Sequence, residues 1–218
     1  MKILFWESKS VIFNSNSLHI CLTTSSRNPD RLSMADIKQE LDKIKGRLSD
    51  ANFLSNKGLS NEVGIHVFKY APEHELIVRD YIERLVSSPS ESLRVIEKDM
   101  FKIMLEILHE KRVLDSAPEM EEKKGKNFLL TQLQRIAPKE AFLSKMKYDP
   151  HQYGDVLFLT GVGKVYPFMR SHIMLEIMQT AFSDIPIVLF YPGEFNGQNL
   201  ILFDKFNDGN YYRAFNLL

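Results

Sequence analysis

The sequence predicts an α/β fold: a layered Rossmann-like or P-loop-like domain with a mostly parallel sheet, lacking a functional nucleotide-binding motif. Residues 155–170 are the first reason, because they have the pattern of a strand, a turn and a helix start. Within them, residues 156–159 are an unbroken apolar run, typical of a strand buried on both faces. Gly161 and Gly163 let the backbone turn, and Pro167 fits the first position of a helix. The second reason is that strand-like and helix-like segments alternate along the chain, as in parallel sheets covered by helices.

The N-terminal part of the chain has a different character. Residues 1–33 have no sustained apolar period, and we expect them to be poorly ordered. From Met34 onward apolar residues recur at helical spacing, so residues 34–218 are expected to form one domain. We hypothesise that residues 1–33 are upstream sequence translated from a misplaced start. The sequence itself leaves open whether Met1 or Met34 is the native start.

The elements of this domain follow from local patterns. Helices are predicted where apolar residues recur every three or four positions, at residues 34–48, 73–85, 100–108, 127–137, 139–146 and 167–184. Strands are predicted at residues 65–70, 93–97, 156–159, 187–191 and 200–203. Asp99 is the expected N-cap of the helix that follows it. Residues 192–197 are rich in turn formers and are predicted to be a loop. The aromatic residues within 211–215 are expected to dock on the domain.

Composition narrows the possible partners. The 28 basic and 28 acidic residues cancel, so no long-range field favours a nucleic acid or a membrane. A DNA-contacting role would need a local basic surface that the totals do not reveal. No apolar run approaches the roughly 20 residues needed to span a bilayer. Cys21 is the only cysteine, which excludes an intrachain disulfide and fits a reducing cytoplasm.

The glycine turn at residues 161–164 invites a nucleotide-binding interpretation, since backbone N–H groups after a strand can bind phosphate. Its details argue against that interpretation. A P-loop needs glycine where Phe158 stands and a hydroxyl residue where Val165 stands, and the Rossmann pattern needs a glycine in place of Tyr166. The simpler reading is that the glycines allow a sharp turn. A degenerate nucleotide-binding module remains an alternative.

Other catalytic and metal-binding patterns are missing from the sequence. None of the six histidines forms a His-Glu-x-x-His pair, so no metal site is expected. His172 and Glu176 share a helix face, but one such pair is typical of a surface contact. No Gly-x-Ser-x-Gly motif occurs, and Cys21 lies in a segment where nothing positions a thiol nucleophile. We therefore expect no catalytic residue, no cofactor and no enzymatic activity.

The candidate binding site lies in the loops at the carboxyl ends of the predicted strands, where open α/β sheets usually bind ligands or partners. The candidate residues for a partner or ligand are Gly161, Gly163, Lys164, Tyr166, Arg170, Tyr191, Gly193, Glu194 and Phe195. We expect the rings of Tyr166, Tyr191 and Phe195 to be partly exposed, with Arg170 one turn into the next helix. Exposed aromatic rings beside an arginine are typical of a protein-binding hot spot. The alternative is that the rings only cap the sheet.

Several of these motifs, taken in order, resemble one family. They are Gly161-Val162-Gly163, Tyr166-Pro167-Phe168, Arg170-Ser171, Phe190-Tyr191-Pro192-Gly193-Glu194 and Tyr211-Tyr212-Arg213-Ala214-Phe215. Together they resemble the BrxB-like proteins of BREX phage-exclusion systems. The resemblance covers residues 34–218 and is sharp from Asp155 onward.

The resemblance implies a small cytoplasmic component of a multi-protein bacterial defence system. It implies that the gene lies with those of an ATPase, a methyltransferase and a PglZ-type phosphatase-like protein, and it brings no established catalytic residues. The expected function is therefore a non-enzymatic adaptor or assembly subunit that helps to restrict phage. Its expected partners are a PglZ-like protein and other BREX subunits, with nucleic acid contacted only through the complex.

Overall fold

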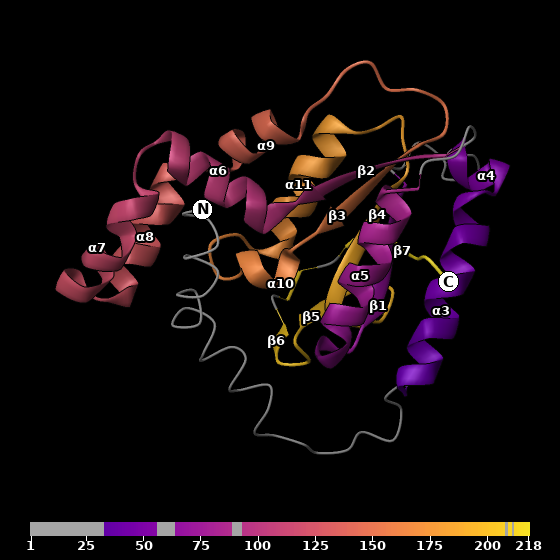
Figure 1. The fold of residues 1–218 in the computed structure, drawn as a ribbon, viewed down its shortest axis with the longest axis horizontal. Helices are drawn as coiled ribbons and strands as arrows, with labels where there is room; N and C mark the ends of the chain where they lie inside the picture. The colour runs from indigo at the N-terminus through magenta and orange to yellow at the C-terminus, as the bar shows by residue number, and fades with distance from the viewer. Residues whose placement is uncertain (1–32, 56–63, 89–92, 208, 211) are drawn as a thin grey trace.

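A mostly parallel sheet forms the centre of the molecule (Figure 1). The computed structural model describes residues 33–55, 64–88, 93–207, 209–210 and 212–218. Five parallel strands lie in the order β2 (Arg94–Asp99), β3 (Asp155–Thr160), β4 (Ile187–Phe195), β1 (Ile65–Tyr70) and β7 (Phe215–Asn216). Antiparallel strands β5 (Leu200–Leu202) and β6 (Phe206–Asn207) extend from the second half of β4. The predicted α/β fold with a mostly parallel sheet is therefore confirmed.

Helices cover both faces of this sheet, so the fold has three layers (Figure 1). One face carries α6 (Met100–Glu110), α8 (Lys126–Ile136), α9 (Lys139–Met146), α10 (Val162–Val165) and α11 (Ser171–Ala181). The other face carries α3 (Met34–Leu48), α4 (Ala51–Leu54) and α5 (Glu75–Val86). Short helix α7 (Ala117–Lys124) and the 3₁₀ turns η1 (Pro72–His74) and η2 (Leu114–Ser116) complete the described helices. None of the described helices is long and apolar enough to cross a membrane.

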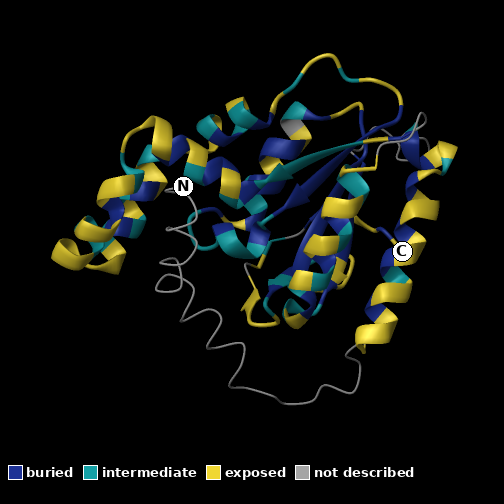
Figure 2. Ribbon diagram, in the orientation of Figure 1, coloured by how far each residue is buried: buried dark blue, intermediate teal, exposed yellow. Residues whose placement is uncertain are grey.

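The packing on both faces of the sheet explains the unbroken apolar run at residues 156–159 of the central strand β3. In β3, Leu157 and Leu159 pack with the layer of α6 and α11, whereas Val156 and Phe158 pack with the layer of α3 and α5. All four side chains are fully buried. Figure 2 shows this burial: the central strands are buried, and the helices that cover them have exposed outer surfaces. A strand covered on both faces needs apolar side chains in both directions, which is the pattern seen in the sequence.

Local signals predicted several element ends correctly. Helix α3 begins at Met34, where Ser33 and Asp36 form a reciprocal capping box. Asp99 is the N-cap of α6, and its carboxylate accepts hydrogen bonds from the backbone N–H groups of Phe101 and Lys102. Of the described aromatic residues within 211–215, Tyr212 is buried and Phe215, although 37% exposed, lies in β7 and pairs with β1, so the expected docking is confirmed there. The expectation for residues 1–33 falls on residues 1–32, which lie outside the described residues.

Pro167 does not begin a helix, contrary to the prediction. Gly161 starts the short helix α10, and the carbonyl of Val165 then accepts the N–H groups of Phe168 and Met169 in a further turn. The peptide bond between Tyr166 and Pro167 is cis. The long helix α11 begins only at Ser171. A local turn closed by one carbonyl therefore separates the glycine turn from the helix.

The predicted loop at residues 192–197 is wrong for residues 192–195, because β4 continues through Pro192 and Gly193 to Phe195, and correct for residues 196–197. Its second half pairs with β5, placing Gly193 opposite Leu202. Gly193 has a φ of 150°, and a Cβ there would lie 2.1 Å from the carbonyl oxygen of Ile201. These turn-forming residues are thus compatible with a strand because the β5 backbone comes unusually close at this point.

Candidate functional site

The turn after β3 is built around Gly161. This residue has a φ of 70°, and a Cβ on it would lie 2.2 Å from Oδ1 of Asp99. Asp99 ends β2 and caps α6, so the ends of two neighbouring strands meet at this glycine. Both the positive φ and the close approach of the Asp99 carboxylate require glycine here.

Gly163 lies against a side chain from a distant part of the sequence. A Cβ on Gly163 would lie 2.8 Å from two ring carbons of Phe203 and 3.0 Å from Cγ of Pro192. The second glycine of the turn therefore accommodates an aromatic ring and a proline. The space beside its backbone, which a phosphate group would need, is filled by the protein's own side chains. This packing favours the structural reading of the glycine pair.

Phe203 belongs to the turn that joins β5 to β6. Phe203 and Asp204 both have positive φ values, 54° and 58°, although neither is glycine or asparagine. The N–H of Lys205 donates to the carbonyl of Leu202 at 3.0 Å, and that of Phe203 donates to the carbonyl of Pro192 at 2.9 Å. Left-handed backbone at a large residue costs free energy, so surrounding contacts must hold it in place. The contact between Phe203 and Gly163 supplies such a restraint.

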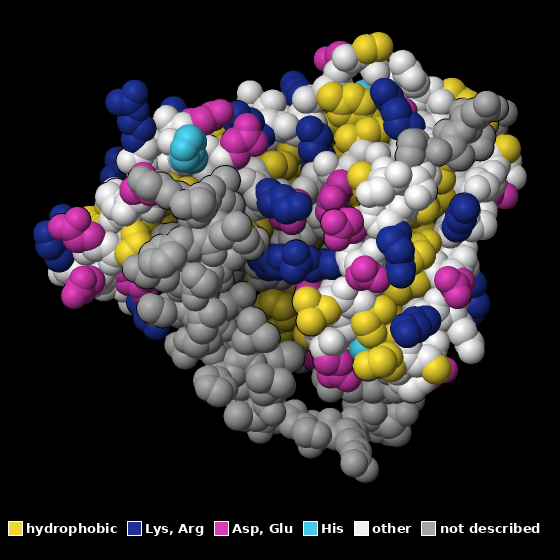
Figure 3. All heavy atoms as spheres, in the orientation of Figure 1, with side chains coloured by type: hydrophobic (Ala, Val, Ile, Leu, Met, Phe, Trp, Pro, Cys, Tyr) yellow, Lys and Arg dark blue, Asp and Glu magenta, His cyan; other side chains and the backbone are white. Residues whose placement is uncertain are grey.

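This turn places three rings in contact at the carboxyl edge of the sheet. The ring centroid of Tyr166 lies 5.1 Å from that of Phe206, which lies 6.5 Å from that of Phe203. Phe206 is 40% exposed, and the other two rings are half-buried. We call Tyr166, Phe203 and Phe206 the aromatic surface. Figure 3 shows hydrophobic and basic side chains next to each other in the region of α10 and β6.

The sequence analysis found only one member of this surface. Tyr166 was a candidate, whereas Phe203 and Phe206 were missed because their turn lacks the Asn-Gly or Asp-Gly signal of a tight hairpin. Tyr191 and Phe195 were expected to be partly exposed, and this is wrong: they are 1% and 2% exposed. The extended β4 places both rings in the core, so for them the packing interpretation is correct.

The remaining candidates take different positions. Gly161 and Gly163 form the turn described above, and Gly193 allows the close approach of β5. Lys164 is half-buried on α10. Arg170 was expected one turn into the helix, which is wrong: it is the exposed N-cap of α11, because the helix begins only at Ser171, and its side chain makes no capping bond. Glu194 is exposed on β4, where it forms an ion pair with Lys69 at 2.6 Å.

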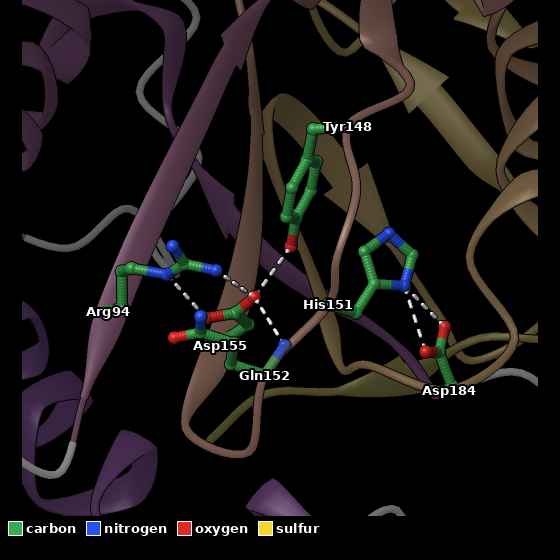
Figure 4. A network of polar contacts seen from close by, with 6 residues as sticks. All are labelled: Arg94, Tyr148, His151, Gln152, Asp155 and Asp184. Atoms are coloured by element: carbon green, nitrogen blue, oxygen red, sulfur yellow. Dashed lines mark hydrogen bonds and ion pairs between the residues drawn. The ribbon is translucent and has the colours of Figure 1, made fainter.

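A separate polar cluster lies at the opposite, amino-terminal edge of the sheet (Figure 4). Asp155, the first residue of β3, has a fully buried side chain and binds Arg94, the first residue of β2. Arg94 donates from Nε to Oδ1 and from Nη2 to Oδ2, each at 2.6 Å. Oδ2 also accepts from the hydroxyl of Tyr148 at 3.1 Å and from the N–H of Gln152 at 2.9 Å.

The pKa values in this cluster fit an ion pair in which neighbouring groups stabilise the charged Asp155 carboxylate. Burial alone raises the pKa of Asp155, but hydrogen bonds from Arg94, Gln152 and Tyr148 outweigh it and hold the pKa below its usual value. Burial, and then the Asp155 charge, raise the pKa of Tyr148. A carboxylate that already accepts four hydrogen bonds has little capacity left for a substrate. The cluster therefore joins β2 to β3.

His151 extends the same cluster. Its Nδ1 lies 2.8 Å from both carboxylate oxygens of Asp184. Its ring packs between Tyr148, at 4.6 Å, and Phe182, at 5.6 Å between centroids. Among the residues that the structure describes, no group of three or more His, Cys, Asp or Glu side chains has an arrangement that could hold a metal ion.

Comparison with known proteins identifies the family. Residues 96–217 match the family model described as "BREX protein BrxB". A BREX protein BrxB from Bacillus cereus (strain H3081.97) is 41% identical over 192 residues, which cover 85% of this chain and 99% of the relative. A BREX protein BrxB from Escherichia coli O9:H4 (strain HS) is 32% identical over 195 residues, covering 84% of this chain and 92% of the relative. No solved structure matches. The resemblance seen in the sequence is confirmed: the chain belongs to the BrxB family of BREX proteins.

Proposed function

We propose that this chain is a non-enzymatic adaptor of an anti-phage BREX system, and that it binds another subunit of that system. The PglZ-like protein is the partner we propose first. The observation that carries the proposal is the aromatic surface, in which three rings are held in place at the carboxyl edge of the sheet. Exposed aromatic rings on a rigid support are the usual anchors of protein interfaces.

The packing of the sheet edge supports a binding role over a catalytic one. In open α/β sheets this edge forms the crevice for small ligands. Here Phe203 and Pro192 pack against the glycine turn, and the extended β4 carries β5 and β6 over the same region. Because the β5–β6 hairpin fills this crevice, the region has an outer surface that a partner protein can contact and little space for a substrate.

The polar side chains support the same proposal. Asp155, Arg94 and Tyr148 satisfy one another at the amino edge, where they stabilise the strand ends. Thr160, at the carboxyl end of β3, donates to Glu97 at 2.7 Å, and the Asp99 carboxylate caps α6. These groups therefore have structural partners already, which suits a scaffold that works by contact.

Co-expression tests the proposal. The tagged chain should be produced together with the other BREX subunits of its own locus, purified, and analysed by size-exclusion chromatography. We expect the PglZ-like protein to co-elute in a fixed ratio with the wild-type chain. Phe206→Ser should reduce that ratio, whereas Leu76→Ser should not, because Leu76 is 74% exposed on α5 over the other face of the sheet. Elution of the chain alone, with every subunit tested, would overturn the proposal.

A further inference from the structure

The charges around the aromatic surface indicate what kind of segment binds there. Residues 161–170 and 203–207, which carry its three rings, contain three basic side chains, Lys164, Arg170 and Lys205, and one acidic side chain, Asp204. The whole chain is neutral, with 28 residues of each sign, so this local excess departs from the average. The carboxylate of Asp99, which lies against Gly161, adds a second acidic group, so a partner segment that covers the rings would meet three basic and two acidic groups, a small positive excess.

The geometry of the surface also restricts the shape of the partner. Phe206 and Asn207 form β6, both are exposed, and β6 pairs only with β5 among the strands that the structure describes. No second described strand pairs with β6, and an extended partner segment can align with the edge of such a strand.

The rings are held before any partner arrives. The ring of Phe203 packs against Gly163 and Pro192, and the N–H of Phe203 donates to the carbonyl of Pro192, so contacts hold this residue despite its positive φ. Phe206 then contacts both Phe203 and Tyr166. Rings that are already ordered lose little conformational entropy on binding, which makes them efficient anchors.

We propose that the aromatic surface binds an extended, acidic segment of another BREX subunit, with an apolar side chain of that segment against Phe206 and a carboxylate on Arg170. This inference rests on the proposed adaptor function and adds the chemistry of the bound segment. Arginine suits this role because its planar guanidinium binds a carboxylate through two hydrogen bonds. Arg170 is the N-cap of α11, the helix that follows the turn containing Tyr166, and its side chain is exposed.

Site-specific crosslinking tests the inference in the intact complex. Phe206 is replaced by photoreactive p-benzoylphenylalanine, the complex with the PglZ-like protein is irradiated, and the joined peptide is identified by mass spectrometry. The control places the same group at Tyr153, which is exposed on a loop before β3. We expect position 206 to crosslink to one partner peptide that has a net negative charge and at least one large apolar residue.

A charge series on Arg170 completes the test. Arg170→Glu should weaken the complex at least tenfold at low salt, and Arg170→Lys should weaken it less than threefold. Raising the salt concentration should weaken the wild-type complex and leave the Arg170→Glu complex nearly unchanged.

The failures of the two proposals are distinguishable. A complex that forms but crosslinks from position 206 to a basic peptide, or not at all, overturns the acidic-segment inference and leaves the adaptor function standing. Equal affinities across the Arg170 series overturn it as well. If no BREX subunit forms a complex with the chain, the adaptor function and this inference both fall.

Discussion

Arg94 and Asp155 are the first residues of the neighbouring strands β2 and β3, and two hydrogen bonds of 2.6 Å each join their side chains. The Asp155 side chain is fully buried, so its charge depends on this contact. We predict that Asp155→Asn lowers the free energy of unfolding by about 2 kcal/mol, because hydrogen bonds to a buried charge contribute that much. Urea denaturation gives the value. The control is Asp80→Asn, since Asp80 pairs with Arg84 on an exposed helix face and should change stability by less than about 0.5 kcal/mol. Equal losses in both variants would show that the strand-end pair has no special weight.

His66 makes stability depend on pH. Its side chain is nearly buried between Phe53 and Phe215, and its Nδ1 has no hydrogen-bond partner among the described residues. Burial, and then the charge of Arg47, lower its pKa from 6.5 to about 4. Between these two values the unfolded chain binds a proton that the folded chain does not, so stability falls as the pH is lowered.

A shift of this size corresponds to about 3 kcal/mol across that pH interval. His66→Leu should flatten the slope of unfolding free energy between pH 6.5 and pH 4, and His109→Gln, at an exposed position, should leave it unchanged. Chemical denaturation at several pH values measures the slope. If the unfolding free energy of His66→Leu keeps the same pH dependence, that dependence comes from other titratable groups.

Gly163→Ala should destabilise the protein by about 1–3 kcal/mol, because the new methyl group would overlap the ring of Phe203. In a Phe203→Leu background the same change should cost at least about 0.5 kcal/mol less, since residues in contact are energetically coupled. Gly46→Ala is the matched control. Nothing lies within 4 Å of a Cβ at Gly46 in α3, so alanine should stabilise that helix. Additive effects of Gly163→Ala and Phe203→Leu would mean that the two residues do not pack against each other.

The filled glycine turn makes a prediction about nucleotides. Phe203 and Pro192 occupy the space beside Gly163, so millimolar ATP or GTP with magnesium should raise the melting temperature by less than about 1 °C. Thermal-shift measurements across a range of concentrations check this. A rise that grows with nucleotide concentration and saturates would favour the degenerate nucleotide-binding alternative.

The sequence predicted those parts of the fold that depend on local signals. Helix 139–146 was predicted at its observed ends, and Asp99 was recognised as a cap because a short polar side chain before an apolar period carries that information. The extension of β4 was missed because Pro192 and Gly193 usually form turns. Only pairing with β5, a tertiary contact, makes them part of a strand.

The sequence predicted the location of the candidate site, at the carboxyl edge of the sheet, but it identified only some of the residues that form it. Parallel strands bring their carboxyl ends to one edge, and Tyr166 does lie there. Which rings reach the surface depends on the course of β4 and on a turn whose positive φ values fall on Phe203 and Asp204. Asp204 is a common turn former, but Phe203 gives no signal of positive φ in a sequence, so the aromatic surface became visible only in three dimensions.

The central claim is that the aromatic surface binds another BREX subunit. Isothermal titration of the PglZ-like protein into the wild-type chain, Phe206→Ser and Leu76→Ser tests it most directly. Since anchor residues contribute about 2 kcal/mol or more, we predict at least a tenfold weaker affinity for Phe206→Ser and an unchanged affinity for Leu76→Ser. The same affinity for all three proteins would contradict the claim.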